Sequence, residues 1–179
     1  NTELKTDYVG ILRKRQKLVE ARDLALELYR DDERNLHMKS QYAVTSMQVG
    51  DYGTALELFE QLLTEMPGEP VTLTSKGHAL KTVGQTDAAI ECYREACREG
   101  IIHGEAWQSL ANLKTYRFTD SEIDRMEELS RLPTLRSFDR VYLFFALGKA
   151  YEDRGSYDIA FQRYSDGNHI KRSESRYIA

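Results

Sequence analysis

The chain has 179 residues, of which 41% are hydrophobic and 30% are charged, and its formal net charge is −4. This composition is typical of a folded protein and argues against a disordered chain. The slight acidic excess does not indicate a nucleic-acid surface, and no apolar run is long enough to cross a membrane, so neither partner is expected.

The first predicted pair of helices occupies residues 2–35. Its second helix carries apolar side chains at steps of three and four residues, namely Leu18, Ala21, Ala25 and Leu28. This spacing is typical of an amphipathic helix. Its first helix ends in a basic run from Arg13 to Lys17, which we interpret as a solvated helix end. A nucleic-acid or lipid patch is the alternative.

Two further pairs, in residues 36–69 and 70–103, have clearer boundaries. Gly50 is expected to end one helix by taking a positive φ, and Asp51 is expected to cap the next helix. Gly84 is expected to end a helix in the same way in the following pair. Each of these segments therefore predicts a hairpin of two helices.

Residues 104–140 begin in the same register and then depart from it. Phe118 stands where the earlier pairs have a turn glycine. The run Thr119–Glu122 has the pattern of an N-cap followed by an acidic first turn. We therefore expect an irregular pair whose second helix, Ser121–Leu132, is re-angled, followed by a loop at 133–139.

Residues 141–172 return to the pattern, with Gly155 between two helices, and residues 173–179 predict a frayed polar tail. No alternating apolar and polar run predicts a strand. The fold class expected is all-α. Residues 1–172 are expected to form a single solenoid of about five antiparallel helix pairs, wound as a right-handed superhelix.

Small residues recur at a fixed spacing of 34 residues. Most members of two sets are small: Val9, Ala43, Gly77 and Ala111 in the first helices, and Ala21, Ala55, Ala89 and Ile123 in the second helices. A fifth stretch, 37 residues on, has Gly148 and Ala160 at these positions. Two helices can cross closely where such residues meet. A constant period of this kind predicts stacked copies of one helix pair rather than one globular core.

Three segments combine small, aromatic and turn residues at matching offsets. They are Trp107-x2-Leu110-Ala111, Phe144-x2-Leu147-Gly148-x2-Tyr151, and Gly50-Asp51-Tyr52 with Ala55 and Phe59. Together they resemble the tetratricopeptide repeat (TPR) family over nearly the whole chain. The resemblance implies a protein-protein interaction scaffold whose first helices line a concave face.

The last third of the chain carries a narrower resemblance. The stretch WQSLANLKTYRFTDSEIDRMEEL, followed by FFALGKAYEDRGSYDIAFQRYSDGNHIKR, is similar to bacterial proteins that join TPR repeats to a sulfotransferase domain. In that family the catalytic domain follows the repeats and uses 3′-phosphoadenylyl sulfate. If the chain is the non-catalytic repeat region of such a protein, it would present the acceptor or mediate dimerisation.

The resemblance to the TPR family implies that a protein or peptide segment binds along the concave face. The candidate peptide-binding residues are Gln41, Val44, Gln48, Ser75, His78, Lys81, Gln108, Asn112, Tyr116 and Lys149. Side-chain amides can bond an extended main chain without requiring a particular sequence. The alternatives are an ordinary surface asparagine at Asn112 and a solvated or locally bonded ring at His78.

Catalytic patterns are absent from the sequence. None of the four histidines pairs with another His or Cys at helical spacing, so no metal site is expected. No positioned nucleophile and no strand with a glycine-rich turn for a phosphate is visible. We therefore expect neither catalysis nor a cofactor in this chain. Tyr142 and Phe145 predict an exposed apolar patch, which would serve a homodimer or a downstream domain of the same chain.

The cysteines indicate the cellular compartment, and the start of the sequence bears on whether the chain is part of a longer one. Cys92 and Cys97 lie in one predicted helix at a spacing that a disulfide does not span. Two free, packed thiols indicate a reducing compartment, and we expect the cytoplasm. The chain starts at Asn1 without an initiator Met or a leader, which suggests a piece of a longer chain or a trimmed one.

Overall fold

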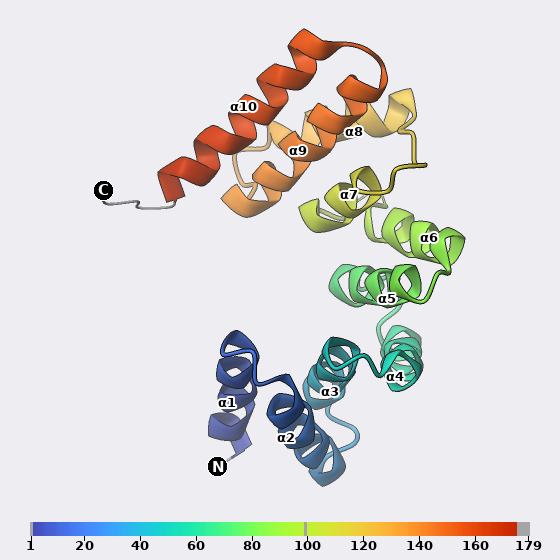
Figure 1. Cartoon of the computed structure of the whole chain (residues 1–179), viewed down its shortest axis with the longest axis vertical. Coiled ribbons are helices and arrows are strands. Elements are labelled where there is room, and N and C mark those ends of the chain that lie inside the picture. Colours follow the sequence, from blue (N-terminus) through green and yellow to red (C-terminus); the bar gives the residue numbers. More distant parts are fainter. Residues whose placement is uncertain (1, 99, 175–179) are drawn as a thin grey trace. The chain divides into compact units, whose positions relative to one another are not determined.

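The structure is a computed structural model and describes residues 2–98 and 100–174 (Figure 1). These residues form helices joined by short connections, and none of them lies in a strand. The expected all-α fold class is confirmed. The chain divides into two compact units, unit 1 (residues 1–92) and unit 2 (residues 93–179).

The helices follow one another in hairpin order. They are α1 (Thr2–Lys14), α2 (Leu18–Asp31), α3 (Leu36–Gln48), α4 (Tyr52–Glu65), α5 (Pro70–Thr82), α6 (Thr86–Ala96), α7 (Gly104–Ala111), α8 (Asp120–Ser130), α9 (Ser137–Asp153) and α10 (Tyr157–Glu174). The boundary between the two units falls inside α6. A single right-handed superhelix over residues 1–172 stays a prediction.

In unit 1 each helix from α1 to α4 packs on the next one in the chain. The small residues of the 34-residue period lie at these crossings. Ala43 and Ala55 are 0% exposed, and they share one apolar cluster with Phe59, Leu62 and Ala79. The interpretation of the small residues as nesting points is confirmed here, because these alanines are fully buried where the helices pack on one another.

The ends of the helices in unit 1 follow the sequence signals. Gly50 and Gly84 have φ values of +88° and +84°, which residues with a side chain rarely adopt. At the start of α4, the Thr54 N–H donates to Asp51 Oδ1 at 3.2 Å. The two predicted glycine stops and the predicted N-cap are confirmed.

In unit 2 the helix α9 packs most extensively on α10 and α7, and less extensively on α8. The α9–α10 crossing needs a glycine, because a Cβ placed on Gly148 would lie 2.6 Å from the ring of Tyr164. Ala160 on α10 is also buried. Small residues therefore lie at the helix crossing of the last pair as well.

The segment between α7 and α9 differs from expectation. The helix α7 ends at Ala111, so Asn112 is its C-cap and Tyr116 lies outside any helix. The physical reason is Phe118, which is buried and packs near the Trp107 ring at a centroid distance of 6.2 Å. Burying Phe118 requires the chain to leave the helix and turn back.

The boundaries of the next two helices also need correction. The helix α8 spans Asp120–Ser130 rather than Ser121–Leu132, although its predicted cap is confirmed as a full capping box between Thr119 and Glu122. The helix α9 begins at Ser137, inside the segment expected to be a loop. Polar contacts hold this early start, because Arg140 Nη2 donates to the Leu132 carbonyl at 2.6 Å.

The predicted tail is shorter than expected. The helix α10 continues to Glu174, past the expected end of the last pair at residue 172. Residues 175–179, which make up the rest of the predicted frayed tail, lie outside the described residues.

Candidate functional site

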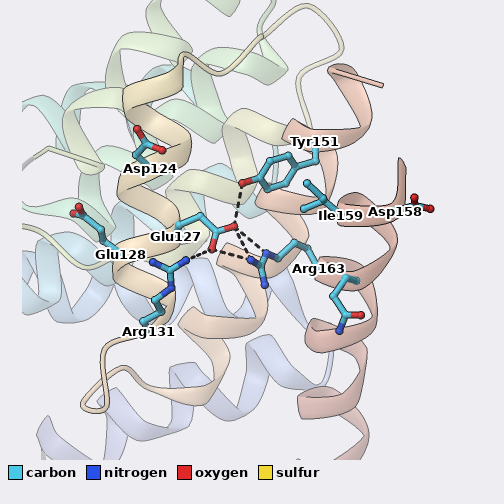
Figure 2. Close-up of a pocket in the computed structure, with 9 residues that line it drawn as sticks. Asp124, Glu127, Glu128, Arg131, Tyr151, Asp158, Ile159 and Arg163 are labelled. Carbon is cyan, nitrogen blue, oxygen red and sulfur yellow. Dashed lines mark hydrogen bonds and ion pairs between the residues drawn. The ribbon is translucent and has the colours of Figure 1, made fainter. Parts of the chain in front are cut away.

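Unit 2 contains a cleft of about 720 Å³ between α8 and α10. Figure 2 shows its centre, where side chains from three helices converge on the carboxylate of Glu127. Arg163 Nε donates to Glu127 Oε1 at 2.9 Å, and Arg163 Nη2 donates to Oε2 at 3.0 Å. Tyr151 adds a hydrogen bond at 3.2 Å, and Arg131 adds one at 3.3 Å.

These contacts occupy the hydrogen-bond acceptors of the Glu127 carboxylate at the centre of the cleft. Glu127 is 8% exposed, and both of its oxygens already accept two hydrogen bonds. A buried carboxylate that is paired and fully bonded is a brace between helices rather than an available acid or base. We name this set of side chains the Glu127 brace, and its groups are not available to bind a ligand.

The better candidate is a groove on α7 and α9 made of two adjoining hollows, which we call the α7–α9 groove. The first hollow, of about 340 Å³, is lined by Gln108, Ala111, Asn112, Lys114, Phe145, Lys149 and Tyr164. The second, of about 190 Å³, is lined by Gln108, Phe138, Val141, Tyr142, Phe145, Lys171 and Glu174. Both hollows are lined by Gln108 and Phe145, so they adjoin at these two residues.

One end of the groove is rich in amide groups. Gln108 is half-buried on α7, and Asn112 is exposed at the C-cap of that helix. Among the described contacts, neither side-chain amide has a hydrogen-bond partner, so both can bond a ligand. Lys149 forms an ion pair with Asp153 beside them, which offsets its positive charge.

The other end of the groove is aromatic. Phe138 packs edge-to-face on Tyr142 at a centroid distance of 6.3 Å, and the Arg136 guanidinium lies 4.3 Å from the centre of the Phe138 ring. Phe138 is 47% exposed, so this end offers an apolar surface to a partner. Burial raises the pKa of Tyr142, and nearby Glu105 and Asp139 raise it further.

Tyr164 forms part of the floor of the amide end. Its hydroxyl donates to Glu152 Oε2 at 2.9 Å, and its ring lies 6.4 Å from that of Phe145. Burial raises the pKa of Tyr164 to about 12, with further contributions from this hydrogen bond and from the charge of Glu152. The phenol is therefore neutral at physiological pH and acts as a fixed donor rather than as an acid.

The structure brings together three of the predicted binding residues and separates a fourth. Gln108, Asn112 and Lys149 line one hollow. Tyr116, which the register placed with them on a helix, instead donates from its hydroxyl to Glu122 Oε1 at 2.5 Å. Burial and this hydrogen bond raise the pKa of Tyr116. Its predicted place on the first helix of the fourth pair is wrong, because α7 ends before it.

The other six predicted residues lie in unit 1, on two neighbouring helices. Gln41, Val44 and Gln48 belong to α3, and Ser75, His78 and Lys81 belong to α5, which contacts α3.

Two of the α3 residues have structural roles in unit 1. Val44 packs against the apolar cluster. Gln48 Oε1 accepts a hydrogen bond from Arg13 Nε at 2.9 Å. Whether these six side chains bind a partner stays a prediction.

Sequence reasoning missed Phe138 as part of the site, since it lay in an expected loop. A signal was present in the sequence. Apolar side chains follow the three- and four-residue steps of a helix, at Phe138, at Val141 or Tyr142, and at Phe145. Extending that periodicity backwards from Val141 would have found the early start of α9 and the aromatic end of the groove.

Other site types find little support within the described part of the chain. Among residues 2–98 and 100–174, no three His, Cys, Asp or Glu side chains gather in a group that could hold a metal ion. Both cysteines are free, and burial raises the pKa of the Cys97 thiol, as does nearby Glu122. None of the described helices is both long and apolar enough to span a membrane.

Comparison with known proteins supports the repeat architecture. Residues 72–99 match the tetratricopeptide repeat family. A crystal structure of MamA superposes with a TM-score of 0.63, covering 94% of this chain and 97% of that chain at 17% identity. The chain has a TPR fold. The similarity to structures at this level of identity concerns the fold alone.

Two further proteins extend the TPR comparison. The TPR-like repeats of a Podosopora anserina protein described as a kinesin light chain give a TM-score of 0.65 at 17% identity, covering 97% of this chain and 96% of that chain. An uncharacterised protein of Aquifex aeolicus strain VF5 is 25% identical over 123 residues, which are 69% of this chain. The chain spans 16% of the length of that relative.

Proposed function

We propose that this TPR chain is a protein-interaction module that binds an extended peptide segment in the α7–α9 groove. The observation that carries the proposal is the continuity of the groove, whose amide end and aromatic end meet at Gln108 and Phe145. An amide pair that bonds a main chain, next to an apolar surface that receives a side chain, suits a peptide better than a small metabolite.

The length of the groove sets the size of the segment. Phe138 and Lys149 mark its two ends on α9. At about 1.5 Å per helical residue they lie roughly 16 Å apart. An extended chain covers that distance with about five residues at about 3.3 Å each. The ligand expected is therefore a short extended segment with one aromatic or aliphatic side chain at the Phe138–Tyr142 end.

The test uses a display library of short random peptides, followed by titration calorimetry with the best synthetic peptide. The double variant Gln108→Ala and Asn112→Ala is expected to weaken binding about tenfold, since it removes both amides that reach the main chain. The matched control is Gln61→Ala with Gln85→Ala, two exposed amides outside the groove. Equal affinity of the groove variant and the control variant would exclude this site.

Catalysis forms no part of the proposal. The acidic and basic groups of the Glu127 brace are bonded to one another, and the groove offers amides and aromatic rings rather than a nucleophile beside a base. We infer that the chain acts by holding a partner. A turnover assay is meaningful only after a peptide partner is known, and cleavage or modification of that peptide would contradict the inference.

A second proposal keeps the expected link to bacterial sulfotransferases, in which the chain would be the repeat region that presents the acceptor or mediates dimerisation. None of the relatives named above is described as a sulfotransferase. The support is the residue pattern of the last third of the chain. Coding sequence that continues beyond Ala179 into a strand and a glycine-rich phosphate loop would support the proposal, and a stop codon would end it.

A further inference from the structure

The helix α1 exposes an apolar stripe that the rest of unit 1 does not cover. Leu4, Tyr8 and Ile11 are 66%, 50% and 47% exposed, and they follow the four- and three-residue steps of one helix face. A neighbouring face of α1 is occupied, because Val9 and Leu12 are buried in a cluster with residues of α2. The stripe is thus a second apolar face with nothing packed on it among the described residues.

The internal repeat indicates what kind of element fits this stripe. Residues placed 34 positions later, on α3, are Met38, Tyr42 and Thr45. Met38 belongs to the buried cluster of α1 and α2, and Tyr42 stacks on Tyr29 of α2 at a centroid distance of 5.6 Å. At α3 the same stripe is therefore covered by the second helix of the preceding pair.

The helix α10 is the second helix of a pair, as α2 is, and it exposes apolar side chains of its own. Tyr157 and Phe161 are 70% and 75% exposed. Their counterparts in the second pair are Tyr52 and Leu56 on α4, both partly buried against the cluster that contains Ala43 and Ala79. A hollow of about 240 Å³ follows Phe161 along α10 and can receive a protruding side chain.

The charges of the two faces also match. Short connections such as the one at residues 32–35 place consecutive helices antiparallel. If α10 lay on α1 in that orientation, Asp158 would approach the basic end of α1, which carries Lys14 and Arg15. The basic end of α10, with Lys171 and Arg172, would approach the acidic start of α1 at Glu3 and Asp7.

We propose that α10 of one copy docks on α1 of a second copy, in the antiparallel arrangement that α2 and α3 use within the chain. The contact joins two different surfaces, so it is heterologous and leaves one free face on each end of a dimer. The contact shares Lys171 with the edge of the α7–α9 groove. Its apolar residues Tyr8 and Phe161 do not line that groove, so the proposal does not depend on the proposed peptide binding.

The test is sedimentation velocity of the 179-residue chain and its variants over a range of concentrations. The unmodified chain is expected to self-associate. Tyr8→Glu and Phe161→Glu are each expected to raise the dissociation constant by about tenfold or more, since a carboxylate would enter an apolar contact. The matched control is Val71→Glu, an apolar residue of α5 that is 57% exposed and lies on neither face.

Mixing the two variants distinguishes this heterologous contact from a symmetric contact, in which both copies would use the same surface. Tyr8→Glu keeps an intact α10 face and Phe161→Glu keeps an intact α1 face, so the mixture is expected to form a 1:1 dimer that does not grow further. A monomeric unmodified chain at every concentration would overturn the proposal. Loss of association in only one variant, or no dimer in the mixture, would overturn it as well. Circular dichroism of each variant confirms that it is folded.

Discussion

Unit 1 and the part of unit 2 from α7 to α9 hold their helices with different kinds of contact. In unit 1 the repeat spacing is kept, and helices nest through side chains as small as those of Ala43 and Ala55, both 0% exposed. In unit 2 the spacing is lost between α7 and α9, and polar contacts fix the helices instead. The Gly104 N–H donates to buried Asp139 at 2.9 Å, and Arg163 pairs with buried Glu127.

The difference shows how a sequence repeat specifies the packing of one helix on the next. Where small residues recur at constant spacing, close packing alone specifies how one helix lies on the next. Where the spacing fails, a buried polar group accepts only the one arrangement that satisfies its hydrogen bonds. That arrangement is specific, but it is vulnerable because the loss of one partner leaves the other buried and unpaired.

The largest expected effect comes from removing the centre of the Glu127 brace. Glu127→Ala leaves the largely buried guanidinium of Arg163 without its main partner, and we expect it to cost about 3 kcal/mol of unfolding free energy. The matched control is Glu128→Ala, the exposed neighbour on the same helix, which should change stability by less than about 0.5 kcal/mol. Urea titration followed by circular dichroism measures both, and equal stability of the two variants would show that the brace is dispensable.

Gly104→Ala tests a close backbone contact in unit 2 rather than a charged pair. A Cβ at this position would lie 2.5 Å from the Asp139 carbonyl oxygen and 2.8 Å from its Cα, so backbone must move. We expect a loss of about 2–3 kcal/mol. The control is Gly53→Ala in α4, where the nearest atom to an added Cβ is Asp51 Oδ1 at 4.0 Å and a gain of up to about 1 kcal/mol is expected. A neutral Gly104→Ala would mean that α7 and α9 can separate freely.

Ala55→Leu tests the nesting rule in unit 1. Ala55 is 0% exposed at the crossing of α3 and α4, and the added methyl groups should overpack it by about 1–3 kcal/mol. Ala88→Leu, on the exposed side of α6, is the control and should be nearly neutral. Thermal melting compares the two. If Ala55→Leu has the same melting temperature as the control, close packing of small residues would not be what holds the helices of unit 1.

The smallest effect is a pH dependence in unit 2. Because the pKa of Tyr164 is raised to about 12 in the folded state, the folded protein holds this proton more tightly than the unfolded chain, whose tyrosine has a pKa of about 10. The stabilisation is fully present below about pH 10 and is lost as the pH rises towards 12. Absorbance of tyrosinate measures the titration.

The Tyr164 titration has its own control. Glu152→Gln removes the charge next to the phenol and should move the titration of Tyr164 towards the ordinary tyrosine value. An identical titration in the variant and the unmodified chain would assign the shift to burial alone.

Much of the candidate groove could be expected from the register. The spacing from earlier repeats placed Gln108, Asn112 and Lys149 on one surface, and the structure brings them to one hollow. The aromatic end could not be placed in the same way, since the register sets the last pair to begin at Val141 while α9 begins at Ser137. The hydrogen bond from Gly104 to Asp139 and the bond from Arg140 to Leu132 hold this early start.

The sequence by itself determined the helices, their pairing and most of their ends. Local signals such as Gly50, Asp51 and the Thr119 capping box act within a few residues, and the constant spacing of small residues decides which faces meet. Only the tertiary structure decided the course of the chain from Asn112 to Arg136. Burial of Phe118 against Trp107 and the Glu127 brace depend on residues far apart in sequence, and no local pattern encodes their meeting.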